Sequence, residues 1–327
     1  MTIKALVSII VGFLLLVKAA DWLVSASCSL ARRLGIEDMI IGLTVVAFGT
    51  SMPEFMVNIL SSLNGSSDIA IGNVLGSNIC NILLILGLSA LLFPLPVAKD
   101  TVIAEIPFSL TAALLLAFLV KFSFFQISFQ NTNINGSQNI LNAEDGILLL
   151  CFFLMFMAYI FFIAREKNES EILPDEIPLK KSVLMLITSL FGLYLGGEWV
   201  VRGAVEIARN MGLSESLIAL TIVAIGTSLP ELFTSVTAAA KGRTDLAVGN
   251  IVGSNIFNIL WILGVSSLIR PLEFNLSSDF DMIMTVFAST LLLLALVLGR
   301  KMEIQRRDGL IFVSTYIWYI YRIILRG

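Results

Sequence analysis

The sequence contains no histidine and few charged residues. Among its 327 residues, Asp, Glu, Lys and Arg together make up 14%, whereas hydrophobic residues make up 57%. The absence of histidine removes the commonest metal ligand and the usual proton shuttle at neutral pH, which excludes His-Glu-x-x-His metalloproteases and histidine-dependent serine hydrolysis. No basic stripe is present, so we expect no nucleic-acid partner. The composition instead predicts an integral membrane protein.

Cysteine is also scarce. Cys28, Cys80 and Cys151 each lie within or beside an apolar segment, where a thiol behaves as a small hydrophobe, and we assign all three to packing. An intramembrane enzyme would need a nucleophile with a base, or paired aspartates within its spans. The sequence offers no histidine and no such aspartate pair, so we expect no enzymatic activity and no cofactor.

Long apolar segments make up most of the sequence. A membrane-crossing helix needs about 20 apolar residues, and we find ten such segments, which leave little chain for a soluble domain. The first lacks a small-residue cleavage site and belongs to the repeat described below, so we expect a retained span and not a removed signal peptide. The predicted spans are 5–27, 39–63, 70–93, 102–121, 146–164, 182–205, 215–240, 247–269, 279–299 and 308–325.

Basic residues occur in alternate loops. They gather near Arg32, at Lys99, in 165–181, near Lys241 and in 300–307. Under the positive-inside rule these loops are cytoplasmic, which places both termini on the other side of the membrane. We therefore expect a multi-pass protein of the cell's inner (plasma) membrane with both termini outside the cytoplasm.

One long stretch occurs twice. Residues 41–95 and 218–272 align without a gap, and Glu231 lies 177 residues after Glu54. The step from one copy to the other advances the chain by five spans, an odd number, so the second copy enters the membrane from the opposite face. Inverted repeats of this kind build secondary transporters with a site near the bilayer midplane. We therefore predict an all-α membrane protein of two inverted five-helix repeats, 1–164 and 182–327, joined by a cytoplasmic linker at 165–181.

Glu54 and Glu231 each lie in an otherwise uncharged apolar segment. A carboxylate near the middle of a span costs at least about 2.5 kcal/mol, so it marks a functional site by default. Two copies of one costly feature in the same chain argue for a shared site.

A proline stands directly before each glutamate. Pro53 and Pro230 have no N–H, and their rings clash with the carbonyl four residues earlier, so each helix should break there. Broken backbone at membrane depth survives only where it is buried in protein or lines a cavity, and carbonyls near Ala47 and Ala224 would then become available as ligands. Together with carboxylates and hydroxyls, these carbonyls make a set of oxygen ligands without sulfur or imidazole. Such a set is typical of a site for a hard cation. The hydroxyls beside the carboxylates belong to Thr50, Ser51, Thr227 and Ser228.

The motif Gly-Asn-x-x-Gly-Ser-Asn follows each glutamate, at 72–78 and 249–255. Its glycines have the GxxxG spacing that lets membrane helices approach closely. Residues four apart share one helix face, which pairs Ser77 with Asn81, and Ser254 with Asn258. We expect close approach to bring this face against the break in the preceding span. The remaining asparagines of the motif either bridge helices by hydrogen bonds or contact an ion; these are Asn73, Asn78, Asn250 and Asn255.

The motifs GTSMPE with GNVLGSNICN, and GTSLPE with GNIVGSNIFN, resemble the two α-repeats of the cation/Ca²⁺ exchanger superfamily, specifically its prokaryotic Na⁺/Ca²⁺ antiporter branch. The resemblance covers nearly the whole chain. It implies one central Ca²⁺ site flanked by Na⁺ sites, and exchange of three Na⁺ for one Ca²⁺ across the lipid bilayer. The ion-coordinating positions that it implies are Ala47, Thr50, Ser51, Glu54, Ser77 and Asn81, with their mates Ala224, Thr227, Ser228, Glu231, Ser254 and Asn258.

The chain departs from some relatives, which have Asp at one of the positions of Asn81 and Asn258. Only two carboxylates remain here, and they can neutralise one Ca²⁺ or two of three Na⁺. We therefore expect one net charge to move in each turnover.

Two other functions stay open. A H⁺/Ca²⁺ antiporter of the same superfamily would carry its carboxylate in a GNxxE motif, whereas this chain carries it in GTSxPE, which favours Na⁺. Protonation of Glu54 and Glu231 would still permit coupling to H⁺. A passive cation channel differs from an antiporter in that a Na⁺ gradient could not drive Ca²⁺ uphill through it.

Charged residues also occur within spans one and six. Lys18 and Asp21 are three apart and Glu198 and Arg202 four apart, so we expect each pair to interact within its own helix. We hypothesise that these two spans slide across a fixed core formed by the repeated segments.

Overall fold

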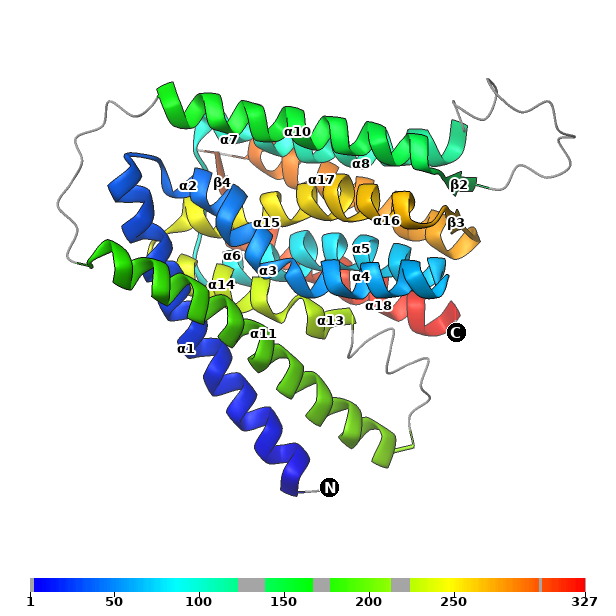
Figure 1. The fold of residues 1–327 in the computed structure, drawn as a ribbon, viewed down its shortest axis with the longest axis horizontal. Helices are drawn as coiled ribbons and strands as arrows, with labels where there is room; N and C mark the ends of the chain where they lie inside the picture. Colours follow the sequence, from blue (N-terminus) through cyan, green and yellow to red (C-terminus); the bar gives the residue numbers. More distant parts are fainter. Residues whose placement is uncertain (1–2, 123–138, 167–176, 213–223, 300–301, 327) are drawn as a thin grey trace, which may run out of the picture.

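The structure is a computed structural model, and almost all of the residues that it describes are helical (Figure 1). Eight described helices are long and apolar enough to cross a membrane, and the bent pair Asp38–Thr50 and Met52–Asn64 makes up to nine. The chain is therefore a helical membrane protein. The seventh predicted span begins in 213–223, outside the described residues, so the count of ten stays a prediction. The described residues are 3–122, 139–166, 177–212, 224–299 and 302–326.

The elements follow the order that the apolar segments predict. Those before the linker are α1 (Ile3–Leu34), α2 (Asp38–Ile41), η1 (Gly42–Val46), α3 (Ala47–Thr50), α4 (Met52–Asn64), α5 (Ser67–Ile79), η2 (Cys80–Leu86), α6 (Gly87–Leu92), α7 (Lys99–Ile103), α8 (Glu105–Phe122) and α10 (Ala143–Glu166). Those after it are α11 (Leu179–Asn210), α13 (Ala224–Thr227), α14 (Leu229–Ala240), α15 (Thr244–Ile256), η4 (Phe257–Ile262), α16 (Leu263–Ile269), α17 (Leu276–Leu298) and α18 (Arg306–Arg326).

Corresponding helices of the two halves run in opposite directions. In Figure 1, α5 runs from right to left toward α6, whereas α15 runs from left to right toward α16. The same reversal relates α8 to α17 and α10 to α18. The segments η1, η2 and η4 are π-helical turns, and η2 and η4 occupy matching places in the two halves.

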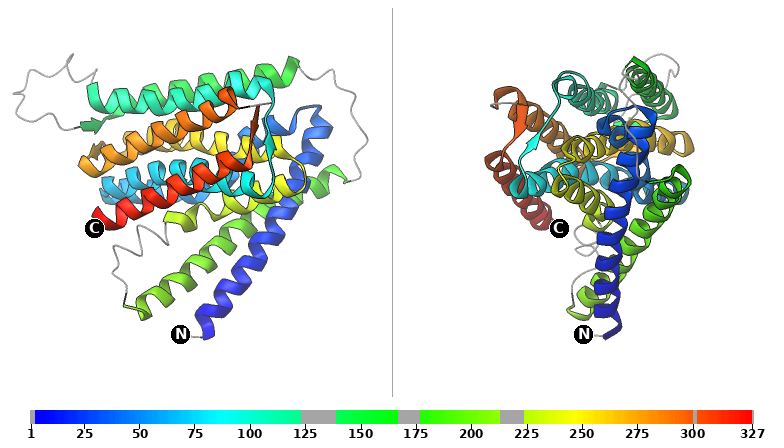
Figure 2. Two further views of the ribbon diagram at one scale, coloured as in Figure 1. Left: turned by 180° about the vertical axis from the view of Figure 1, so that it is seen from behind. Right: turned by 90° about the vertical axis from the view of Figure 1, so that its left-hand side faces the viewer.

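The helices α1 and α11 are longer than predicted, with 32 residues each. Such a helix is about 48 Å long, more than the roughly 30 Å of a bilayer core, and tilt accommodates the excess. Figures 1 and 2 show the two helices side by side and oblique to the rest. Glycine allows this close packing, because a Cβ added at Gly12 would lie 2.8 Å from the Gly196 carbonyl oxygen.

The predicted ion pairs within these two helices are present. Lys18 lies 3.9 Å from Asp21, and Arg202 contacts Glu198. Asp21 also forms a closer pair that the sequence pattern did not indicate, with Lys241 at 2.6 Å. This second pair connects α1 to the residue that follows α14.

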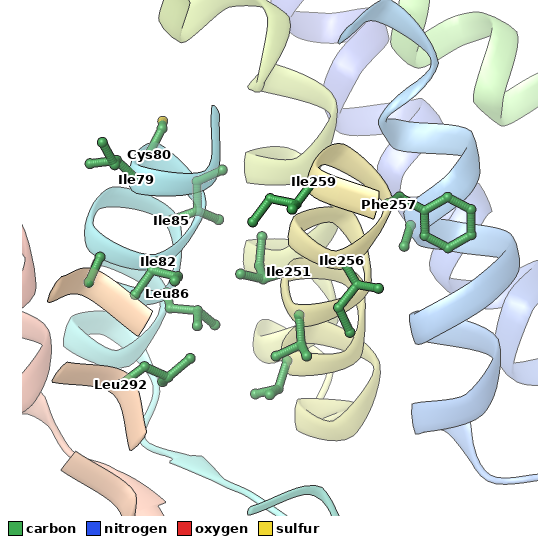
Figure 3. Close-up of a cluster of buried hydrophobic side chains, with 14 of the residues drawn as sticks. Ile79, Cys80, Ile82, Ile85, Leu86, Ile251, Ile256, Phe257, Ile259 and Leu292 are labelled. Carbon is green, nitrogen blue, oxygen red and sulfur yellow. The ribbon is translucent and has the colours of Figure 1, made fainter. Parts of the chain in front are cut away.

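The centre of the protein is formed by the two helices that carry the asparagine-rich motifs. Side chains of α5 and η2 meet those of α15 and η4, and Figure 3 shows Ile85 and Leu86 pointing toward the helix of Ile251 and Ile259. All four are buried. On the far side of that helix, the Phe257 ring lies 5.7 Å from the ring of Phe48 in α3. Both halves therefore contribute to one continuous core.

Four short strands were not predicted. β1 (Leu95–Pro96) pairs antiparallel with β4 (Glu303–Ile304), and β2 (Asn139–Leu141) pairs antiparallel with β3 (Leu272–Phe274). Each pair takes one strand from each half. Segments of two or three residues carry too little periodicity to be distinguished from loops in the sequence.

Candidate functional site

A helix break precedes each of the two buried glutamates. The axes of Asp38–Thr50 and α4 differ by 47° across Ser51, and Ser228 separates α13 from α14. Pro53 occupies the first turn of α4, where a missing N–H removes no helix bond. Glu54 and Glu231 follow in the first turns of α4 and α14, near the positive end of each helix dipole, which favours a carboxylate.

The backbone at the first break corrects one expectation. The Ala47 carbonyl was expected to be free, yet it accepts the Ser51 N–H at 3.0 Å. In an unbroken helix the N–H of residue 53 would donate to the carbonyl of Gly49, two residues after Ala47, and proline has no such N–H. In the second half the Ser228 N–H donates instead to the Ile225 carbonyl at 3.1 Å.

The two carboxylates are buried, with 1% of each residue exposed. Oε1 of Glu54 accepts a hydrogen bond from Ser77 Oγ at 3.3 Å. Oε1 of Glu231 accepts from Ser51 Oγ at 3.2 Å and from Ser254 Oγ at 3.5 Å. Each glutamate thus accepts a hydrogen bond from the serine of the motif that follows it, so the serine-bearing face lies against the preceding break, as predicted.

Threonine hydroxyls connect the halves at the same place. Thr50 Oγ1 lies 3.0 Å from Asn250 Oδ1 and 3.4 Å from Ser254 Oγ. It also lies 3.3 Å from the Ala47 carbonyl oxygen. The hydroxyl of Thr227 is within hydrogen-bonding range of Glu54. The two break motifs therefore face each other across the centre of the protein.

Five oxygens in this region have no hydrogen-bond partner among the described residues. They are buried, and they belong to two carboxylates, two amides and one hydroxyl: Glu54 Oε2, Glu231 Oε2, Asn81 Oδ1, Asn258 Oδ1 and Ser228 Oγ. A buried oxygen without a donor costs about 1–3 kcal/mol, and more when it is charged. A hard cation satisfies such oxygens, because Na⁺ and Ca²⁺ are bound by carboxylate, carbonyl and hydroxyl oxygen.

The other predicted ligands are less well defined. Ser228 is buried, with the thiol of Cys80 beside it. Ala224 opens α13, and its side chain is outside the described part of the chain. Among the described residues, no three Cys, Asp or Glu side chains gather around one point. The charge of the site therefore comes from two carboxylates.

Four asparagines whose role was left open bridge helices. Asn73 Nδ2 donates to the Glu54 carbonyl at 3.1 Å, and Asn250 Nδ2 to Ser235 Oγ at 3.0 Å. Asn78 and Asn255 connect α5 to α15, as described below.

Two further polar residues beside the site were not predicted from the sequence. Asn58 Oδ1 accepts from Asn73 Nδ2 at 2.6 Å, and Ser235 takes the same place beside Asn250. Both residues are buried, four positions after a glutamate and 177 positions apart. The repeat alignment together with the helical period would have identified them.

The second glycine pair does approach another helix closely, but the neighbour is the broken span of the first half and not the preceding break. A Cβ added at Gly249 would lie 2.8 Å from the Met39 carbonyl oxygen, and one added at Gly253 would lie 2.7 Å from that of Leu43. The residues of the second half that correspond to Met39 and Leu43 lie within 213–223, outside the described residues. The predicted approach of Gly72 and Gly76 is therefore not tested.

Comparison with known proteins identifies the family. The family described as "Sodium/calcium exchanger protein" matches residues 4–162 and 181–325. "Putative antiporter CaxA" of Alkalimonas amylolytica is 38% identical, over 97% of this chain and 98% of the relative. "Inner membrane protein YrbG" of Escherichia coli is 38% identical, over 85% of each.

The fold is similar to a solved exchanger. A structure of the sodium-calcium exchanger NCX_Mj, soaked with Na⁺ and Ca²⁺, superimposes with a TM-score of 0.80 at 32% identity, over 98% of this chain and 99% of that chain. Together with the family match, this similarity over nearly the full length leads to one conclusion: the chain belongs to the sodium/calcium exchanger family.

Proposed function

We propose that the protein is a secondary active antiporter that exchanges Na⁺ for Ca²⁺ by alternating access. One observation carries the proposal. Two buried carboxylates, each with an oxygen that lacks a donor among the described residues, lie at facing helix breaks. Two uncompensated carboxylates at membrane depth are costly, and bound cations offset that cost.

The site is assigned to oxygens from both halves. We infer that the ligands are the twelve predicted positions, with Glu54 and Glu231 supplying charge and the hydroxyl, amide and backbone oxygens completing the coordination. Ca²⁺ is favoured over Mg²⁺, because Mg²⁺ demands a tight octahedron and retains its waters. The full set is Ala47, Thr50, Ser51, Glu54, Ser77, Asn81, Ala224, Thr227, Ser228, Glu231, Ser254 and Asn258.

The resemblance to the family supplies the proposed stoichiometry of three Na⁺ for one Ca²⁺, and the charge of the site indicates its electrical consequence. Two carboxylates neutralise one Ca²⁺, whereas three Na⁺ leave one positive charge in excess. Exchange of three Na⁺ for one Ca²⁺ therefore moves one net charge in each turnover, and the membrane potential should drive it.

The proposed architecture is two inverted five-span repeats, 1–164 and 182–327, with a cytoplasmic linker at 165–181. The opposite directions of corresponding helices support it (Figure 1). The basic loops support an orientation with both termini outside the cytoplasm, and the relative described as an inner membrane protein supports the same location for this chain.

Antiport follows if access switches only when the site is filled. An empty site buries two like charges, so the switch is disfavoured until Ca²⁺ or Na⁺ has bound. We propose that α1 and α11 move together across a core of α2–α6 and α13–α16.

Uptake of labelled Ca²⁺ into proteoliposomes tests this function. Vesicles loaded with Na⁺ and diluted into Na⁺-free buffer should accumulate Ca²⁺ above its external concentration, and an inside-positive potential should accelerate uptake. Coupling to H⁺ predicts uptake driven by a pH gradient without Na⁺. With the membrane potential clamped at zero, a passive channel predicts no uphill accumulation under either gradient, and that result would overturn the proposal.

A further inference from the structure

Four buried asparagines form a reciprocal set of hydrogen bonds between α5–η2 and α15–η4. Asn81 Nδ2 donates to Asn255 Oδ1 at 3.0 Å, and Asn258 Nδ2 donates to Asn78 Oδ1 at 3.0 Å. All four residues are at most 2% exposed. Each bond joins a predicted ligand of one half to the last residue of the Gly-Asn-x-x-Gly-Ser-Asn motif in the other half.

Asn78 and Asn255 are themselves held by the backbone. Asn78 Nδ2 donates to the Asn255 carbonyl at 3.3 Å, and Asn255 Nδ2 donates to the Asn78 carbonyl at 3.5 Å. A carbonyl oxygen can only accept hydrogen bonds, so each side chain must direct its NH₂ group toward that carbonyl. Its Oδ1 then faces the asparagine of the opposite motif.

This arrangement fixes the orientation of the amides at Asn81 and Asn258. The two ends of a primary amide have almost the same shape but opposite hydrogen-bonding roles. Because Asn255 and Asn78 present oxygens, Asn81 and Asn258 must direct NH₂ toward them. Their own oxygens are then turned away, and these are the two amide oxygens that lack a donor among the described residues.

We propose that Asn78 and Asn255 are positioning residues that turn the amide oxygens of Asn258 and Asn81 toward the transported cations. The inference rests on the proposed function. Without these acceptors either amide could rotate by 180° and direct two N–H groups at the cation, which would repel it. The chain requires this control because it carries amides at both positions, whereas a carboxylate has two equivalent oxygens.

A double-mutant cycle separates this role from simple helix bridging. Asn255→Leu should weaken Ca²⁺ binding about tenfold, the change that corresponds to 1.4 kcal/mol. In the Asn81→Asp background the same substitution should cause no loss, because a carboxylate needs no orientation and is repelled by the Asn255 oxygen. A structural role predicts the same loss in both backgrounds, and that result would overturn the proposal.

The measurement is equilibrium binding of Ca²⁺ to the purified full chain in detergent, with thermal unfolding in ion-free buffer as the test of folding. The mirror-image cycle, Asn78→Leu with Asn258→Asp, gives an independent answer if Asn255→Leu does not fold. Absence of Ca²⁺ binding by the unaltered protein would count against the proposed function. If the unaltered protein binds Ca²⁺ but the effects of the two substitutions on its affinity simply add, the positioning role is wrong and the proposed function stands.

Discussion

The hydroxyl of Ser51 donates a hydrogen bond to Oε1 of Glu231 at 3.2 Å. Ser51 stands three residues before Glu54 in one half of the chain, yet it binds the carboxylate of the other half. Thr50 lies against Asn250 and Ser254 of that half in the same way. The two motifs are therefore parts of one site, and each carboxylate depends on both halves for its position.

This contact predicts coupling between Ser51 and Glu231. Ser51→Ala removes a hydrogen bond to a charged group, which is worth about 1.5–3 kcal/mol, so Ca²⁺ affinity should fall about tenfold or more. In the Glu231→Gln background the same change should cost far less. Calcium binding measures the effect of Ser51→Ala alone, and thermal unfolding of all four proteins in ion-free buffer measures the coupling.

A matched control is available for this experiment. Ser89 is also a fully buried serine, and its hydroxyl has no hydrogen-bond partner among the described residues. Ser89→Ala should leave Ca²⁺ binding unchanged. Equal losses for the two alanine substitutions would show that Ser51 acts through general packing.

The glutamates themselves give opposite predictions for activity and stability. Glu54→Gln or Glu231→Gln should abolish Na⁺-driven Ca²⁺ uptake, since one carboxylate cannot balance a divalent cation. In ion-free buffer the same variants should unfold at a temperature a few degrees higher, because a buried, uncompensated charge has been removed. Glu273 is exposed on β3, and Glu273→Gln should change neither property. Full uptake by either site variant contradicts the assignment.

The repeat and the chemistry of the site could be predicted because each depends on local signals. Glu54 and Pro53 are conspicuous in an apolar segment, and the second copy fixes their partners. The asparagine contacts could not be predicted, because hydrogen bonds between Asn78 and Asn258 depend on the register of two helices 180 residues apart. Likewise the extra length of α1 and α11 is not visible in a hydropathy window, since tilt is set by packing against neighbouring helices.

Close packing at the second glycine pair predicts a steric effect on the site. A Cβ at Gly253 would lie 2.7 Å from both the Leu43 carbonyl oxygen and the Ala47 Cβ. The first is a backbone atom and the second is bonded directly to the backbone, so neither can turn aside. Gly253→Ala must therefore displace α15 from α3, and we expect lower thermal stability together with weaker binding of Na⁺ and Ca²⁺.

Gly197→Ala is the matched control for this substitution. Its added Cβ would lie 3.8 Å from the nearest described atom, the Gly226 carbonyl oxygen, which is an ordinary contact. Thermal unfolding and ion binding of the two alanine variants should differ clearly. If Gly253→Ala is as well tolerated as Gly197→Ala, the close approach of α15 to α3 does not constrain the site.

The contact between Asp21 and Lys241 offers a test of the sliding movement. The two charged groups lie 2.6 Å apart and connect α1 to the end of α14, so the proposed movement of α1 across the core must break this contact in every cycle. With the native thiols at 28, 80 and 151 replaced by alanine, Asp21→Cys with Lys241→Cys can be joined by a short bis-thiosulfonate reagent. We expect the cross-link to stop Na⁺-driven Ca²⁺ uptake, and a reducing agent to restore it.

Ser8 donates a hydrogen bond to the Trp199 carbonyl in α11, at 2.8 Å. Cross-linking Ser8→Cys to Trp199→Cys would join two helices that move together, and should leave uptake intact. Continued uptake with α1 joined to α14 would rule out the sliding of α1, because a covalent connection to the core allows no displacement of several ångströms.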